Sequence, residues 1–193
     1  MTETPGVRDG RAGRPPASSR ATLSEAACEL FLERGYEATT VADITTRAGV
    51  SRSSFFNYFA SKSAVLWSSL DERIETLETE LAEAQGVDAV AGAVTRLAAG
   101  FAPDSLALAV GHASAMGVVD ELAHEGALRA ARIARAVAPA LERGGASRVA
   151  SEVRGAAWGG AVLAAVRAWA SAGAGRSDLA ASVHEAALIA RGA

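Results

Sequence analysis

Residues 51–57, Ser-Arg-Ser-Ser-Phe-Phe-Asn, gather side chains that suit contacts with nucleic acid. A guanidinium pairs with guanine, an amide pairs with adenine, and a serine hydroxyl bonds to either kind of base edge. If this segment is a short helix, its outer side presents five of these side chains: Arg52, Ser53, Ser54, Phe56 and Asn57. The residue types therefore indicate contacts with bases and phosphates.

Patterns for catalysis and metal binding are missing from the sequence. There is no HExxH, GxSxG or P-loop motif, and the histidines are scattered over the chain. They are His112, His124 and His184. Cys28 falls on the apolar side of an expected helix, which indicates an inert core thiol, and the carboxylates over residues 71–78 fit a solvated helix. We expect no enzyme, no cofactor and no metal site.

Residues 41–58 have the layout of a helix-turn-helix: a helix, a short glycine turn and a second helix. Apolar residues share one face over residues 41–48, and Thr40 or Thr39 is the natural N-cap with Asp43 as the acid of a capping box. Gly49 supplies the backbone freedom of the turn, and Ser51 caps the second helix. Any glycine-linked pair of helices in an all-α protein gives this pattern, so the pattern alone leaves the function open.

The surrounding residues resemble the N-terminal signature of the TetR family of bacterial transcriptional regulators. The resemblance covers about 47 residues, from Arg20 to Leu66. The matching positions are Leu30-Phe31, Gly35-Tyr36, Thr40-Val41, Ile44, Ala48-Gly49-Val50-Ser51, Tyr58-Phe59, Ser61-Lys62 and Leu66. The other two thirds of the chain match the family only in length and helical texture.

This resemblance implies a role in DNA binding for particular residues. Thr40, Tyr58 and Lys62 occupy positions that contact phosphates in the family. The recognition-helix positions are Ser51, Arg52, Ser53, Ser54, Phe56 and Asn57. Phe56 departs from the common tyrosine, so a hydroxyl contact with phosphate is lost there while ring contact with a thymine methyl or a sugar remains possible. Phe55 and Phe59 are expected to be core residues that hold the recognition helix.

The charge is unevenly distributed along the 193 residues, whose formal net charge is -3. Residues 1–62 hold eight Lys or Arg and seven Asp or Glu, a net +1, which leaves eleven against fifteen, a net -4, for the rest. Residues 1–19 are rich in Gly, Pro, Ser and Arg and predict a flexible basic arm. Arg14 of this arm either enters a narrow minor groove or belongs to a solvated tail without a role.

The rest of the chain predicts an all-α fold, because alanine is abundant and no segment alternates as a strand does. We expect one helix from Ser61 towards Gln85 with Gly86 as its stop, then helical segments that are separated by glycine or proline. They fall near 88–99, 104–118, 119–143, 148–173 and 177–191. With the resemblance, this gives a TetR-like fold: a three-helix DNA-binding head over residues 20–66 and a larger helical ligand-binding and dimerisation domain over residues 67–193.

Two helices of the larger domain are candidates for a homodimer interface. Residues 148–173 carry Gly155, Gly159, Val162 and Val166 along one stripe, where small residues would let two backbones approach closely. Residues 177–191 carry a second apolar stripe. Ordinary packing inside one chain would produce the same two stripes.

A ligand pocket is expected among the few large or polar side chains of this alanine-rich domain. The candidates are Phe101, Val110, His112, Met116, Trp158, Val162, Arg167 and Trp169. Each apolar member is also a natural core residue. Arg129, Arg132 and Arg135 form a stripe that suits either an anionic ligand such as a coenzyme A thioester or a solvated helix face.

The sequence thus predicts a DNA-binding repressor that is released from a palindromic operator by a small apolar or amphipathic effector. The alternative is a helical dimer that acts through protein partners and keeps a vestigial head, and the sign of regulation stays open. No apolar run reaches about 18 residues and no secretory signal is recognised, so we expect a cytoplasmic protein and no membrane partner.

Overall fold

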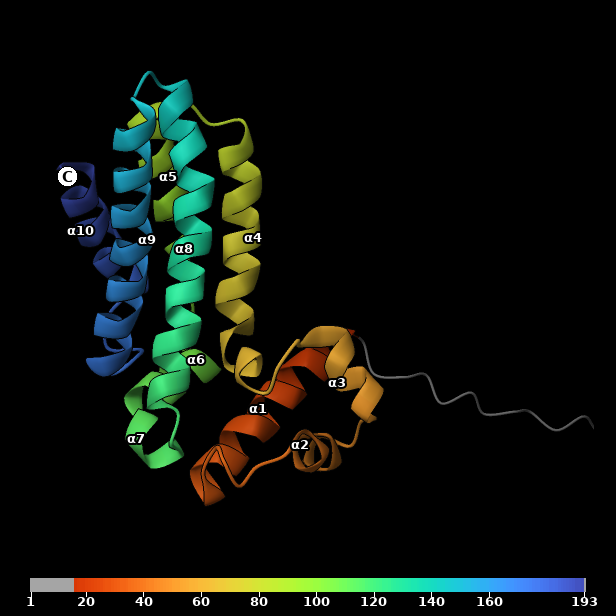
Figure 1. The fold of residues 1–193 in the computed structure, drawn as a ribbon. Coiled ribbons are helices and arrows are strands. Elements are labelled where there is room, and N and C mark those ends of the chain that lie inside the picture. The colour runs from red at the N-terminus through yellow and green to blue at the C-terminus, as the bar shows by residue number, and fades with distance from the viewer. Residues whose placement is uncertain (1–15, 193) are drawn as a thin grey trace, which may run out of the picture.

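The computed structural model describes residues 16–192, and every regular element in that range is a helix. A small head is formed by the first three helices, and an elongated bundle, the body, is formed by the rest (Figure 1). The first helix, α1 (Pro16–Arg34), begins earlier than expected and includes residues 16–19, which the sequence assigned to the arm. Proline suits a first helical turn, since its fixed φ is already helical. Arg14 lies outside the described residues.

The head packs α1 against α2 (Val41–Ala48) and α3 (Arg52–Tyr58) around a fully buried apolar core. Leu23 and Phe31 of α1 meet this core with Ile44 of α2 and Phe55 of α3. In Figure 1, α2 and α3 lie on the side of α1 that faces away from α7. The predicted bounds of α2 are confirmed.

The connection from head to body differs from the single helix that was predicted. It starts as a tight 3-10 turn, η1 (Ser63–Trp67), and continues as α4 (Ser68–Ala82). Gly86 does not end α4; it has a φ of 81° and is the first residue of α5 (Gly86–Ala98). Three of the five residues of η1 are apolar and buried: Val65, Leu66 and Trp67. Their packing therefore outweighs the local preference for one continuous α-helix.

The remaining helices form the body. They are α6 (Ser105–Gly111), α7 (Ala113–Met116), α8 (Val119–Arg143), α9 (Arg148–Ser171) and α10 (Leu179–Gly192). The bounds predicted for α8 are confirmed, whereas the segment expected at 104–118 is broken at His112 into two short helices. Within residues 16–192, no helix is both long and apolar enough to span a bilayer.

The longest pair of helices, α8 and α9, is held at close range by two glycines. A Cβ added at Gly155 would lie 2.8 Å from the carbonyl O of Ala134, and one at Gly159 would lie 2.1 Å from that of Ala130. The stripe expected to meet a second subunit therefore packs inside the chain. The alternative of ordinary packing inside one chain therefore holds for the glycine face, which meets α8, while an interface on another face of α9 stays a prediction.

We predict that Gly159→Ala lowers the stability of the chain, because the new methyl group collides with a backbone oxygen that cannot rotate away. Overpacking of this kind costs about 1–3 kcal/mol. Gly192→Ala is the control, since its Cβ meets no atom within 4 Å. Urea unfolding measures the free energy of unfolding of both variants. Repeating it at several protein concentrations distinguishes a loss of packing inside the chain from a loss of contact between subunits. A Gly159→Ala protein as stable as the wild type would contradict the close packing.

Candidate nucleic-acid interface and ligand cavity

The start of α2 is fixed by a complete capping box. The Thr40 hydroxyl accepts from the backbone N–H of Asp43 at 3.2 Å, and the Asp43 carboxylate accepts from the backbone N–H of Thr40 at 2.8 Å. Because the Thr40 hydroxyl also donates to this carboxylate, the pKa of Asp43 is held below its ordinary value. Gly49 ends α2 with a left-handed φ of 68°. The predicted cap and turn are confirmed.

Serine caps the second helix of the pair. The Ser51 hydroxyl accepts from the backbone N–H of Ser54 at 3.2 Å and lies 2.8 Å from the hydroxyls of both Ser53 and Ser54. Arg52, Ser53 and Asn57 are exposed on the outer side of α3. The structure thus brings the predicted recognition residues together on one surface of the head.

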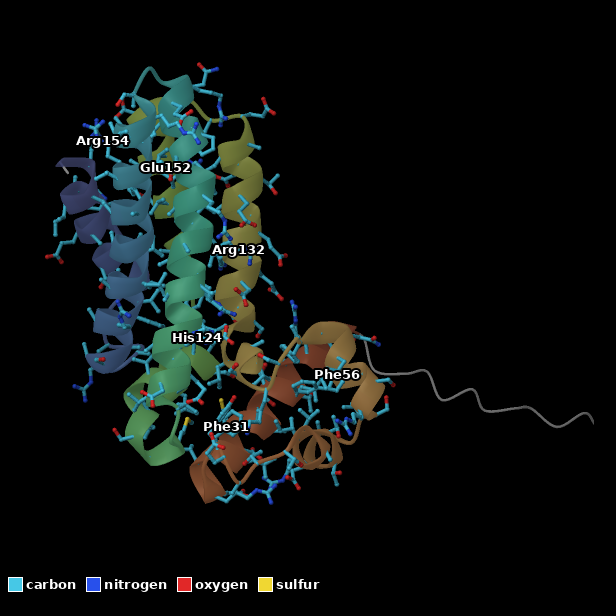
Figure 2. The ribbon with its side chains drawn as sticks, viewed as in Figure 1. Phe31, Phe56, His124, Arg132, Glu152 and Arg154 are labelled. Carbon is cyan, nitrogen blue, oxygen red and sulfur yellow. The ribbon has the colours of Figure 1, made fainter. Side chains whose placement is uncertain are left out.

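The three phenylalanines of this region divide as the sequence predicts. Phe55 and Phe59 are buried with ring centroids 5.3 Å apart, and they fasten α3 to the head. Phe56 is 50% exposed on the opposite side, and the guanidinium of Arg52 lies 5.8 Å from its ring centroid. Figure 2 shows Phe56 at the head, remote from Glu152 and Arg154 at the far end of the body. An exposed aromatic ring beside a guanidinium suits contact with a base or a sugar.

Lys62 is used inside the head rather than left free. Its ammonium donates to the carbonyl oxygens of Tyr36 and Thr39 at 2.7 and 2.9 Å and lies 3.8 Å from the ring centroid of Tyr36. Partial burial lowers the pKa of Lys62. The lysine therefore holds the loop that leads into Thr40 and α2. Its expected contact with phosphate stays a prediction that must use the remaining donor.

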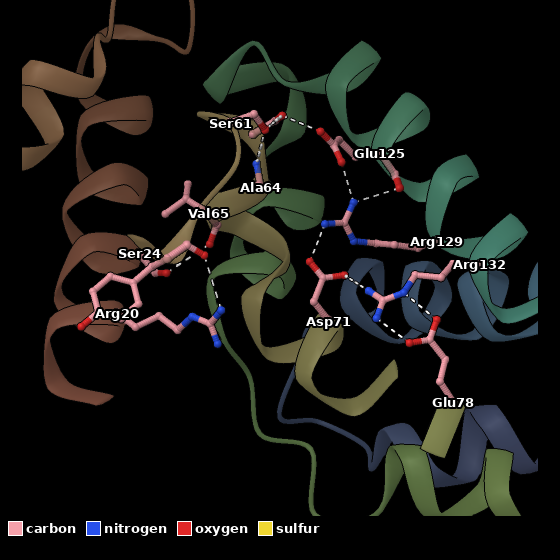
Figure 3. A network of polar contacts seen from close by, with 12 residues as sticks. Arg20, Ser24, Ser61, Ala64, Val65, Asp71, Glu78, Glu125, Arg129 and Arg132 are labelled. Carbon is pink, nitrogen blue, oxygen red and sulfur yellow. Dashed lines mark hydrogen bonds and ion pairs between the residues drawn. The ribbon is translucent and has the colours of Figure 1, made fainter. Parts of the chain in front are cut away.

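A polar network joins η1, α4 and α8 at the end of the body next to the head (Figure 3). The buried guanidinium of Arg129 donates to Glu125 and Asp71, both at 2.6 Å, and lies 4.5 Å from the ring of Trp67. Glu125 also accepts from the Ser63 hydroxyl at 2.7 Å, and these donors hold its pKa below the ordinary value despite its burial.

The arginine stripe of α8 is therefore largely structural. Arg129 and Arg132 are bound by carboxylates, since Arg132 donates to both carboxylate oxygens of Glu78 at 2.7 and 2.6 Å. Arg135 is exposed. The partners on α4, Asp71 and Glu78, lie more than fifty residues away, so spacing along one helix gave no sign of these two pairs. The two paired arginines are not available to a coenzyme A phosphate in this structure.

A cavity of about 190 Å³ opens between η1, α6, α7, α8 and α9. Its walls are Trp67, Val110, Ala113, Val119, Leu122, Ala123, Leu163, Val166 and Arg167. Of the eight residues proposed for a ligand site, Val110 and Arg167 line this cavity. Trp67 was missed, because its position next to the head signature marked it as part of the connection.

The other six candidates do not line the cavity. Five of them are buried core residues: Phe101, Met116, Trp158, Val162 and Trp169. Phe101 and Trp169 pack edge to face with centroids 5.8 Å apart, and the indole N–H of Trp169 donates to Ser177 at 2.9 Å. His112 is exposed, with its Nδ1 3.1 Å from the carbonyl O of Leu108. The large side chains fill the core because alanine leaves the space for them.

The cysteine and the metal-ligating residue types decide whether the residues that the structure describes hold a reactive or metal-binding arrangement. Burial raises the pKa of the Cys28 thiol to about 11, so it stays protonated at neutral pH. Among residues 16–192 no group of three or more His, Cys, Asp or Glu side chains is arranged to hold a metal ion.

Residues 23–67 match the family model described as bacterial regulatory proteins of the tetR family. These residues form a TetR-family DNA-binding head. The matched segment contains the capped α2, the glycine turn, α3 and η1. It ends at Trp67, one of the residues that line the cavity. The TetR fold, with its helix-turn-helix head and helical body, is the fold expected from the sequence.

Curated relatives resemble the TetR head alone. The repressor DhaR of Mycobacterium sp. (strain GP1) is 49% identical over 45 residues, which are 23% of each chain. The repressor KstR2 of Mycobacterium tuberculosis (strain ATCC 25618 / H37Rv) is also 49% identical over 45 residues, 23% of this chain and 22% of the relative. The alignments thus span less than a quarter of these relatives.

A solved structure extends the likeness to the body. FadR of Thermus thermophilus, described as a TetR-family transcriptional repressor in complex with lauroyl-CoA, is 26% identical with a TM-score of 0.52. The match covers 89% of this chain and 92% of FadR. The body described above therefore has the architecture of a TetR-family protein that was solved with a ligand.

We predict that Lys62→Met loosens the loop before α2, because two carbonyl oxygens lose their charged donor. Each such bond contributes about 1.5–3 kcal/mol when buried and less here, where the lysine is partly exposed. Hydrogen exchange without DNA is expected to rise over residues 36–44. Unchanged exchange there would remove the structural role and leave the ammonium free for phosphate.

Proposed function

We propose that the protein is a DNA-binding transcriptional regulator, a repressor that a small molecule releases from its operator. The observation that carries this proposal is the surface of α3, where Arg52, Ser53, Phe56 and Asn57 are exposed together on a capped helix-turn-helix of the TetR family. These groups match the donors, acceptors and methyl groups at the edges of bases in the major groove.

Within this proposal the contacts divide by chemistry. Arg52 and Asn57 read base edges, and Ser51, Ser53 and Ser54 bind bases or phosphates. Thr40, at the exposed start of α2, and the half-buried Tyr58 bind phosphates together with the remaining donor of Lys62. Arg14, outside the described residues, would add a contact in the minor groove.

We propose a homodimer whose interface uses the face of α9 that points away from α8. Most exposed residues of that face are small or aliphatic, with Arg167 as a charged member: Val149, Val153, Ala156, Gly160, Ala164 and Ala168. On the neighbouring α10, Leu188 and Ile189 are 59% and 71% exposed. Monomeric proteins rarely expose an apolar surface of this kind to water. A second copy of the chain that covers it would place the two α3 helices at the spacing of successive major grooves, about 34–36 Å.

We infer that the effector binds in the cavity beside Trp67. The likeness to a FadR solved with lauroyl-CoA supports a ligand in the body. Trp67 belongs to η1, which follows the head directly, and its ring also contacts Arg129 of the polar network next to the head. A ligand bound against this ring would favour one position of η1 and α4 and so set the separation of the two heads.

The effector needs only a difference in affinity between the two states. A few kcal/mol of preference for the state that does not bind DNA is enough to empty an operator. The proposal places the whole process in the cytoplasm and assigns no catalytic step to the protein.

Selection of DNA fragments from a random pool, with a salt titration, tests the proposed function. We expect a palindromic consensus, and Arg52→Ala is expected to weaken binding to it by about 1–3 kcal/mol, roughly 5- to 150-fold, through the loss of a bidentate base contact. Arg148→Ala, an exposed arginine of the body, is the control. No enriched sequence would overturn the proposal in favour of a helical dimer that acts through protein partners.

The dimer is tested by Val153→Glu, which places a charge on the proposed interface. We expect monomers in sedimentation experiments and weak binding to a palindrome, because a buried unpaired carboxylate is costly. Leu32→Glu, an exposed aliphatic residue of α1, is the control and is expected to leave the mass unchanged. A dimeric Val153→Glu protein would exclude this face of α9.

A further inference from the structure

We propose that the cavity beside Trp67 takes a compact apolar molecule of about six to eight carbon atoms that carries a carboxylate at Arg167. This inference rests on the proposed function, because it names the class of the effector. It also departs from the long acyl thioester that the comparison with FadR would suggest.

The size of the ligand follows from the volume of the cavity. A dry apolar cavity of about 150 Å³ accommodates benzene, with six carbon atoms. The cavity here has about 190 Å³, which in proportion admits about eight carbon atoms. A chain of twelve carbons does not fit without moving the walls.

The walls leave little room for growth. Trp67, Leu163 and Val166 are buried and belong to the packed core. Trp67 is itself confined, because a Cβ added at Gly126 would lie 3.4 Å from the edge of its ring. A longer ligand would therefore have to separate α8 from the helices around it.

The lining provides apolar surface and one charge. Eight of the nine lining residues are aliphatic or aromatic, and Arg167 is the exception. Arg167 and Val119 are exposed, so they mark the side from which the cavity opens to solvent. Among the side chains that the structure describes, Arg167 has no hydrogen-bond or ion-pair partner, in contrast to Arg129 and Arg132.

Arg167 supplies the charge at the mouth of the cavity. A guanidinium there favours a ligand with an anionic acceptor group over a plain hydrocarbon.

A coenzyme A thioester lacks partners here. Its phosphates need several cations, and Arg167 is the sole charged residue that lines the cavity. The nearest other guanidiniums along α8 are neutralised by Asp71, Glu78 and Glu125. The charge at this site suits a single carboxylate.

The test is a titration of the free protein, without DNA, with straight-chain carboxylates of four to twelve carbons and with lauroyl-CoA. Calorimetry gives the affinities. We expect a rise of about fourfold per methylene up to six to eight carbons, then a fall, with no tighter binding by lauroyl-CoA. Affinity that keeps rising to twelve carbons, tighter binding by lauroyl-CoA, or no binding by any carboxylate would overturn the inference.

Two variants test the contacts. Arg167→Gln is expected to weaken the best carboxylate roughly three- to tenfold and to leave the primary amide of equal length unaffected, whereas Arg148→Gln changes neither. Trp67→Phe is expected to remove most of the change in tryptophan fluorescence on binding, since Trp158 and Trp169 do not line the cavity. Equal affinities of acid and amide in the wild type would overturn the assignment of a carboxylate.

The two proposals fail separately. If a palindrome is enriched but no carboxylate binds, the class of the effector is wrong and the regulator remains. If a compact carboxylate binds but no DNA is enriched, the cavity is assigned correctly and the proposed function fails.

Discussion

The arrangement of head and body depends on the contacts of the buried Arg129 guanidinium. It ties Glu125 of its own helix to Asp71 of α4 and lies against the ring of Trp67 in η1. A buried charge that lost one of these partners would be strongly destabilising. The network therefore fixes the angle at which the connection leaves the head, and it passes next to the wall of the cavity. A movement of Trp67 cannot leave the network unchanged.

The close approach of α8 and α9 determines what the rest of the body presents. Because Gly155 and Gly159 carry no Cβ, the two helices share backbone contact on one face. The opposite face of α9 then carries short aliphatic side chains into solvent, which is the surface assigned to a second subunit. The cavity forms at the other end of the same pair, where α6 and α7 replace a continuous helix. A helix that continued through His112 would fill a different volume there.

The head separates support from recognition over one short helix. Phe55 and Phe59 anchor α3 in the core, so Arg52, Phe56 and Asn57 point outwards from a rigid base. Lys62 serves the support, since its ammonium binds the loop before α2. The net charge of the chain says little about DNA binding, because the acidic residues belong mainly to the body, and several of them hold arginines of α8.

Local physics within the sequence determined the head. The capping box of Thr40 and Asp43, the turn at Gly49 and the cap at Ser51 act over three or four residues, so their types and spacing predict the helices and the exposed face of α3. The bounds of α8 follow in the same way from its helical pattern. In the body, only the tertiary structure decided which helix faces meet. Whether Gly159 faces α8 or a second subunit, whether Trp158 or Trp67 lines the cavity, and whether Arg129 binds a ligand or Asp71 depend on residues more than twenty positions apart. Such pairs meet only when whole helices pack, and the period of one helix carries no information about which of its faces meets which neighbour.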